Sequence, residues 1–268
     1  MGLRLNYRVE VAIMNPQTGV QKRPKGDTIM HEYYAENKGK FKKEMDGFLR
    51  LISRELEEDT NRPYSELLEE VWECYEQDML EHFPYIGGSK SSGTRNLTGA
   101  YCFVALGEVC RGKYDMSLDR WGYLTTECYR RYFDRIPQPL RLLAGKLLGR
   151  PGLVNSMLRK KDARNAANAA EYPGSFVTQV QPPRPGYPVI YHMTVCPLHQ
   201  FARGFGYMDY MPYLCNLDYV MFEAMNVPFY REKTCAAGDG VCDFKMKPGA
   251  PVNPAWPCHC LTPGDPLK

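Results

Sequence analysis

The densest chemistry of this sequence lies in residues 196–244, CPLHQFARGFGYMDYMPYLCNLDYVMFEAMNVPFYREKTCAAGDGVCDF. This stretch contains four of the ten cysteines of the chain, one histidine and six acidic residues. Thiols, imidazoles and carboxylates are the groups that carry nucleophilic, acid–base and metal chemistry in proteins. We therefore expect the functional site of this protein within these residues.

The residues around this stretch alternate between strand and helix patterns. The predicted elements are, in order, strands at Ser175–Val180 and Val189–Val195, helices at Pro197–Gly206 and Tyr210–Met225, and strands at Phe229–Cys235 and Cys242–Met246. Proline is tolerated in the first turn of a helix, and AAGDG is a hairpin-type connection between the last two strands. This order predicts an α+β fold in which two helices pack on a small antiparallel sheet.

The first part of the chain is expected to be mainly helical. A strand or extended arm is predicted at Tyr7–Ile13, followed by helices at Ile29–Glu58 and Asn61–Met79, the second with Pro63 in its first turn. After a connector at 89–96, one helix is predicted through Ala100, Val104 and Cys110, and another is capped by Ser117. We divide the chain into a helical region, 1–170, and an α+β cysteine-rich region, 171–268, packed as one compact unit.

A basic segment connects the two regions. Residues 139–164 contain seven lysines and arginines and one acid, Asp162, interleaved with leucines. Such a segment is either a solvated basic face or a surface for a membrane or an anionic partner. Pro151-Gly152 divides it into two short pieces, which favours the solvated face.

The composition restricts the class of partner. The net charge of +3 over 268 residues gives no basic excess of the kind that indicates nucleic-acid binding. No run approaches the ~18 apolar residues of a membrane span, and the first residues do not form a signal peptide. We expect a cytoplasmic protein with reduced thiols, a small-molecule substrate, no nucleic acid and no stable membrane insertion. Whether it forms a homo-oligomer stays open.

Two cysteines of the central stretch have neighbours that favour acid–base or nucleophilic chemistry. Cys196 precedes a predicted helix, whose amide groups would lower the pKa of its thiol. Cys215 lies three residues before Asp218, about one helical turn away on the same face. One helix could thus present a thiol and a carboxylate to one bound substrate.

A metal site and plain packing are the alternatives. Glu232, Cys235 and Cys242, with Cys215 as fourth ligand, could hold zinc in a tetrahedral site. The spacing lacks the compact CxxC pairs of common zinc sites, and no cofactor other than zinc is indicated. Free cysteines also pack frequently in protein cores. The Cys258-His259-Cys260 sequence could bind metal too, in a proline-rich tail that we expect to be irregular and mobile.

Residues 175–248 resemble the L-2-amino-thiazoline-4-carboxylic acid hydrolase family. The resemblance rests on the cysteine–proline opening at Cys196, on Cys215 and Asp218 within LCNLD, and on Gly238 with the later Cys242-Asp243-Phe244. It implies hydrolysis of a cyclic isothiourea or amidine: water attacks the ring carbon between nitrogen and sulfur, and N-carbamoyl-L-cysteine forms.

The resemblance leads to an assignment of roles. As catalytic residues we assign Asp218, which would face the amidinium-like substrate, and Cys215 and His199, which would transfer protons. As substrate-binding residues we assign Cys196, Tyr213 and Asp243.

A second resemblance leads to another class of function. Glu232, Cys235 and Cys242 with a Gly-Asp turn are similar to the vinyl-reductase-type small-molecule-binding domain, whose sensor members hold structural zinc. This gives the C-terminal half a vinyl-reductase-like fold and implies a non-enzymatic binding module with a cysteine and glutamate zinc site. Six residues separate the last two cysteines here, which departs from that pattern.

Overall fold

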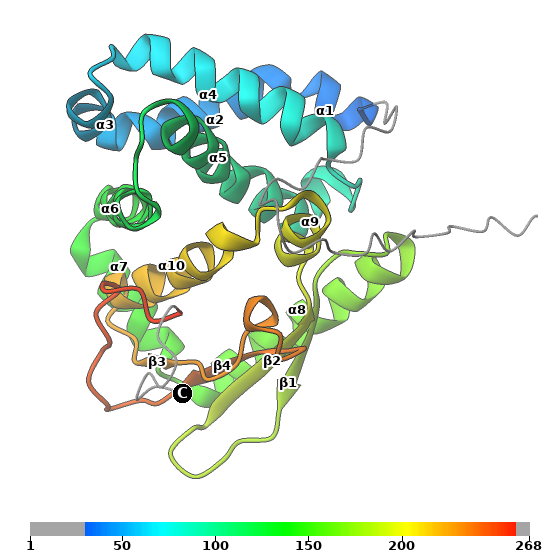
Figure 1. Cartoon of the computed structure of the whole chain (residues 1–268). Coiled ribbons are helices and arrows are strands. Elements are labelled where there is room, and N and C mark those ends of the chain that lie inside the picture. The colour runs from blue at the N-terminus through cyan, green and yellow to red at the C-terminus, as the bar shows by residue number, and fades with distance from the viewer. Residues whose placement is uncertain (1–29, 261–268) are drawn as a thin grey trace, which may run out of the picture.

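A computed structural model describes residues 30–260 of the chain (Figure 1). The strand predicted at Tyr7–Ile13 lies outside the described residues. The described part has a helical N-terminal half and a four-stranded antiparallel sheet with helices packed on it. The predicted α+β class is therefore confirmed.

The helical half consists of short helices followed by three longer ones. Their bounds are α1 Glu32–Glu36, α2 Lys38–Leu49, η1 Arg50–Ile52, α3 Ser53–Thr60, α4 Tyr64–Asp78, η2 Leu80–His82, η3 Gly88–Lys90, α5 Ser92–Lys113 and α6 Leu118–Asp134. The predicted helix at Ile29–Glu58 is broken near Asn37 and again at η1. Its apolar stripe is nevertheless buried as expected, with Phe41, Met45 and Leu56 in the core.

The caps of two helices can be compared with the sequence prediction. Ser117 caps α6, because its side chain accepts a hydrogen bond from the amide of Arg120. Pro63 is the N-cap of α4 and not part of its first turn, one position earlier than predicted. A proline fits there because it has no amide hydrogen to leave unpaired.

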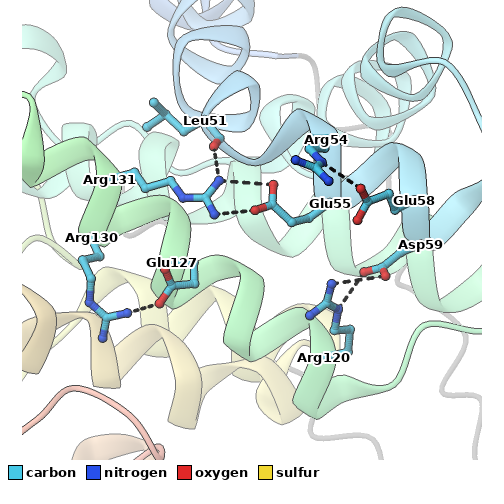
Figure 2. Close-up of polar contacts among 9 residues, drawn as sticks. All are labelled: Leu51, Arg54, Glu55, Glu58, Asp59, Arg120, Glu127, Arg130 and Arg131. Atoms are coloured by element: carbon cyan, nitrogen blue, oxygen red, sulfur yellow. Dashed lines mark hydrogen bonds and ion pairs between the residues drawn. The ribbon is translucent and has the colours of Figure 1, made fainter.

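Ion pairs join α6 to α3 across the helical half, as Figure 2 shows. Arg131 contacts both carboxylate oxygens of Glu55 and donates to the carbonyl of Leu51 at 2.6 Å. Arg120 pairs with Asp59 at 2.7 Å. These contacts fix the position of α6, on which α10 packs.

The basic segment forms α7 (Gln138–Leu148) and α8 (Pro151–Glu171), and the break falls at Pro151 as predicted. Its leucines are more exposed than a core helix allows: Leu140 is 56% and Leu143 54% exposed. None of the helices within residues 30–260 is both long enough and apolar enough to cross a membrane.

The sheet has the strand order β1-β2-β4-β3, and every neighbouring pair is antiparallel. Its strands are β1 Val177–Gln181, β2 Val189–Val195, β3 Phe229–Tyr230 and β4 Cys242–Met246. Tyr191 of β2 lies opposite Phe244 of β4, and their rings stack with centroids 4.4 Å apart. Helix α8 packs along β1 and β2.

The strand predicted at Phe229–Cys235 is wrong after its second residue, because β3 ends at Tyr230. The amides of Glu232 and Lys233 donate to the carboxylate of Asp243, at 2.9 and 2.6 Å. These donors are thus removed from strand pairing. Cys235 instead begins the short helix η5 (Cys235–Ala237).

Helix α10 (Met211–Ala224) connects the helical half to the sheet (Figure 1). Near its start, Tyr213 packs against Gly122 of α6. Near its end, the ring of Phe222 stacks on Phe229 of β3 at 4.5 Å. The preceding helix α9 (Pro197–Phe205) packs against α5, and η4 (Met208–Tyr210) links α9 to α10. One hydrophobic cluster contains side chains from α2 to α6 together with α9 and α10.

Candidate functional site

The most unusual residue beside α10 is a buried arginine, Arg231, directly after β3. Only 2% of its side chain is exposed. The rings of Tyr219, Phe229 and Phe244 lie 5.7, 5.4 and 5.1 Å from its guanidinium carbon. An arginine keeps its charge in a protein, and a buried charge is costly unless partners compensate it. Its hydrogen-bond partners therefore determine what this place can do.

Arg231 brings together residues from two separate parts of the chain. Its Nη1 donates to Oδ2 of Asp218 at 2.7 Å, and its Nη2 donates to the backbone carbonyl of Cys215. The same Nη2 lies 3.8 Å from the sulfur of Cys260. Two predicted catalytic residues, Cys215 and Asp218, thus lie beside one buried cation.

Asp218 has one oxygen bound and one free. Its Oδ1 has no hydrogen-bond partner within residues 30–260, and 35% of the side chain is exposed. Its negative charge also acts on Tyr129 of α6 and Lys161 of α8. Burial and then Asp218 raise the pKa of Tyr129 to about 12. Burial lowers the pKa of Lys161, and Asp218 opposes this effect. The free oxygen is available to a ligand.

The thiol of Cys215 is protonated at neutral pH. Burial raises its pKa well above the ordinary value, and the positive charge of Arg231 opposes this only in part. The nearby Cys260, Cys242 and Cys196 raise the pKa further. Only a thiolate is a good nucleophile, so Cys215 suits the donation of a proton better than nucleophilic attack.

Cys196 does not have the activated thiol that its position before a helix predicts. It is the N-cap of α9, and the amides of Leu198 and His199 do act to lower its pKa. Burial outweighs them and raises the pKa of Cys196 to about 12. The expected activation by the helix is therefore a minor effect at this residue.

His199 and Tyr213 do not join Cys215 and Asp218. Burial and the charge of Arg203 lower the pKa of His199, and within residues 30–260 its ring makes no hydrogen bond with Cys215 or Asp218. Tyr213 donates its hydroxyl hydrogen to Asp119 of α6, on the side of α10 that faces the helical half. Its ring also packs edge-on against Trp121. Both contacts are those of a residue that packs two helices together.

Asp243 uses its carboxylate for the backbone next to Arg231. Oδ1 accepts the two amide hydrogen bonds from Glu232 and Lys233, and Oδ2 lies 3.0 Å from Nζ of Lys245. These partners hold the residues that follow Arg231 against β4. In this arrangement Asp243 positions the arginine.

The proposed zinc ligands are occupied by other contacts. Glu232 pairs with Lys245 at 2.9 Å. The amide of Cys235 donates to the sulfur of Cys242 at 3.2 Å, and its thiol contacts the carbonyl of Met193. Within the described part of the chain, no three histidine, cysteine or acidic side chains are arranged to hold a metal ion. The donor set therefore does not fit the zinc alternative.

The sequence prediction missed two residues of the site, Arg231 and Cys260. A hydrogen bond with Cys258 lowers the pKa of Cys260 to about 7, and the charge of Arg231 acts in the same direction against burial. The sequence shows the two neighbouring cysteines at 258 and 260 as candidate functional residues. It does not show that the fold places Cys260 beside Arg231. The segment is irregular, as predicted.

The expectation that this tail is mobile is wrong as far as Cys260. The amide group of Asn216 on α10 donates to the carbonyl of Ala255 at 2.6 Å, and its oxygen accepts the amide hydrogen of His259 at 3.0 Å. Cys258 is only 4% exposed. The tail is therefore packed on α10, which places Cys260 beside Arg231.

Comparison with known families tests the resemblances found in the sequence. Residues 152–246 match the family model of L-2-amino-thiazoline-4-carboxylic acid hydrolase. The resemblance to this family is thus confirmed for the C-terminal part of the chain, which contains α8, the sheet and α10. Cys215, Asp218 and Arg231 lie inside the matched segment, whereas Cys260 and the helices α1–α7 lie outside it. No curated protein and no solved structure matches the chain.

Proposed function

We propose that this protein is a hydrolase that opens a small cyclic isothiourea or amidine of the 2-amino-thiazoline-4-carboxylate type. The observation that carries the proposal is the half-bound carboxylate of Asp218. Arg231 holds one of its oxygens, while the other has no partner among the described residues and lies on a partly exposed side chain. The name of the matching family supports hydrolysis as the type of reaction.

The free oxygen of Asp218 receives the cationic end of the substrate. An amidinium group presents N–H donors, and a carboxylate accepts such donors in charge-assisted hydrogen bonds. Arg231 restricts the rotation of the carboxylate because it binds Oδ2. A fixed acceptor loses less entropy when the substrate binds.

The thiols of Cys260 and Cys215, both beside Arg231, each carry out one of the two proton transfers. Cys260, with a pKa of about 7, is substantially ionised at neutral pH and takes a proton from the attacking water. The water oxygen then forms a bond to the ring carbon between nitrogen and sulfur. The carbon–sulfur bond breaks, and the protonated Cys215 gives its proton to the leaving sulfur.

These steps balance. The hydroxyl of the tetrahedral intermediate becomes the urea carbonyl and releases its proton to solvent. One proton then passes from Cys260 to Cys215, and both thiols return to their initial states. Arg231 contacts both residues, through the sulfur of Cys260 and the backbone carbonyl of Cys215.

The test is turnover of L-2-amino-thiazoline-4-carboxylate in ¹⁸O-labelled water, with detection of the product by mass spectrometry. We expect N-carbamoyl-cysteine that carries one ¹⁸O atom. Cys215→Ser should lower kcat by about 10²-fold or more, the usual contribution of a general acid. Asp218→Asn should raise KM, because the charge that pairs with the amidinium is lost.

Cys110→Ser is the matched control, because Cys110 is also a buried thiol but lies on α5 in the helical half. It should retain the wild-type rate. Absence of product from the wild-type protein would reject the hydrolase. Binding of the substrate without turnover would instead support a small-molecule-binding module.

A further inference from the structure

A cavity of about 350 Å³ opens between α8 and the start of α5. It is lined by residues of η3, of the first turn of α5 and of the second half of α8, and by Phe176 before β1. Four of the lining residues are cations and none is acidic: Lys90, Arg95, Lys161 and Arg164. A cavity of this composition has a positive potential and favours an anion.

The charges of these four cations are not balanced by ion pairs in the described part of the chain. None of them forms an ion pair within residues 30–260, although many other lysines and arginines of the chain do. The acid next to Lys161 along the chain, Asp162, is bound elsewhere. Its oxygens accept hydrogen bonds from the hydroxyl of Thr178 at 2.7 Å and from the amide of Val180 at 2.6 Å. The positive charge of the cavity is therefore available to a ligand.

Backbone amide groups at the cavity wall add to its preference for an anion. Helix α5 is 22 residues long and begins at the cavity wall with Ser92. The first amide groups of a helix have no acceptor within the helix, and the positive end of its dipole favours an anion. The helix start is held in place, because Ser91 accepts hydrogen bonds from Gly93 at 3.1 Å and from Asn168 of α8 at 3.3 Å. Two separate elements thus form one rigid wall.

We propose that this cavity binds the carboxylate group of the substrate and thereby selects cyclic amidines that carry one. This inference rests on the proposed function and extends it to substrate selectivity. A 2-amino-thiazoline-4-carboxylate has a cationic amidinium and an anionic carboxylate on one small ring. The protein has a half-bound carboxylate at Asp218 for the first and four unpaired cations for the second.

Lys161 connects the two places. It lines the cavity, and the charge of Asp218 also acts on its ammonium group. Because Lys161 lines the cavity, its removal should weaken recognition of the carboxylate more than that of the ring. Arg95, at the helix start, lines the cavity from α5 and is exposed, so its substitution does not disturb the core.

The experiment compares L-2-amino-thiazoline-4-carboxylate with 2-amino-2-thiazoline, the same ring without the carboxylate. For Lys161→Met and for Arg95→Gln we expect KM for the carboxylate substrate to rise about tenfold, with kcat little changed. The KM for 2-amino-2-thiazoline should stay at its wild-type value. Lys160→Met is the control, since Lys160 is the neighbouring cation on α8 but does not line this cavity.

A second measurement separates this inference from the hydrolase proposal. Titration calorimetry with thiazolidine-4-carboxylate, which lacks the amidine, should show binding to the wild-type protein that weakens about tenfold in both cavity variants. This result would support the cavity even if no turnover occurs. Equal affinity in wild type and variants would overturn the inference. Binding of inorganic phosphate but not of the carboxylate would also overturn it, because the cavity would then serve another anion.

Discussion

Oδ2 of Asp218 accepts a hydrogen bond from Arg231 at 2.7 Å, and this contact joins the middle of α10 to the end of β3. The arginine is almost completely buried, whereas the carboxylate is partly exposed. Arg231 is therefore part of the protein core, whereas Asp218 is accessible to solvent. Substitutions of the two residues should have different consequences.

Arg231→Met should mainly lower the stability of the fold. The substitution removes the one hydrogen-bond partner that Asp218 has within residues 30–260, and it removes the donor to the carbonyl of Cys215. Removal of one partner of a buried ion pair typically costs 3–5 kcal/mol, and we expect about 3 kcal/mol since Asp218 can be partly hydrated. Urea unfolding gives this value. Arg203→Met on α9 is the control, and a change below about 0.5 kcal/mol for Arg231→Met would contradict the structure.

The thiol of Cys260 should react with iodoacetamide at a lower pH than a thiol whose pKa is raised by burial, such as that of Cys110. Its pKa is about 7, so the rate of alkylation should reach half of its maximum near pH 7. Mass spectrometry of digested protein identifies the modified residue. Cys110, which burial shifts to a pKa of about 12, is the internal reference and should stay unmodified over the same range. A midpoint above pH 8.5 for Cys260 would show that Arg231 and Cys258 do not stabilise its thiolate.

Asn216→Ala should release the C-terminal segment from α10. Both halves of the Asn216 amide bind this segment, through Ala255 and His259, and the side chain is fully buried. We expect a loss of about 2 kcal/mol in unfolding free energy, because a buried carbonyl and a buried amide lose their partner. The alkylation midpoint of Cys260 should rise at the same time. Asn96→Ala, an exposed asparagine of α5, should change neither quantity.

The ion pair between Glu55 and Arg131 predicts a pH-dependent contribution to stability (Figure 2). The hydrogen bond from Arg131 lowers the pKa of Glu55 below its ordinary value in the folded protein. The contribution is therefore present above about pH 4.3, the value in an unfolded chain, and is lost as the pH falls through the lower folded value.

The matching experiment measures unfolding of Glu55→Gln between pH 3 and pH 7. The variant should be less stable than wild type by up to about 1 kcal/mol near neutral pH, and the two proteins should converge at low pH. Glu58→Gln is the control on the same helix, because its pair with Arg54 is largely exposed. A difference that grows as the pH falls would contradict the assignment.

The sequence predicts those parts of the fold that local signals determine. The alternating residues of Val189–Val195 give the bounds of β2 correctly, and Pro197 with Gly206 gives those of α9, which ends in a left-handed glycine cap. Cys215 and Asp218 both contact Arg231, Cys215 through its backbone carbonyl and Asp218 through its carboxylate. The bounds of β2 and α9 depend on residues that are close together in the sequence.

The parts of the site that were missed depend on contacts between distant residues. The burial of Arg231 requires Asp218, Phe244 and Cys260, which come from α10, β4 and the tail. The early end of β3 follows from Asp243, eleven residues after Glu232. His199 and Tyr213 were assigned from their position in the central stretch, yet Tyr213 binds Asp119, 94 residues earlier in the chain. No local pattern contains this information.

The docking of residues 255–260 on α10 has a consequence for biosynthesis. A message with a premature stop codon between Met246 and Ala255 would encode the whole segment that matches the hydrolase family. Its product would contain Arg231 and Asp218 but lack Cys260, whose pKa is about 7. A gene model cut short at that point would still contain the whole matched segment, but it would encode a protein without the thiol that we propose as the base.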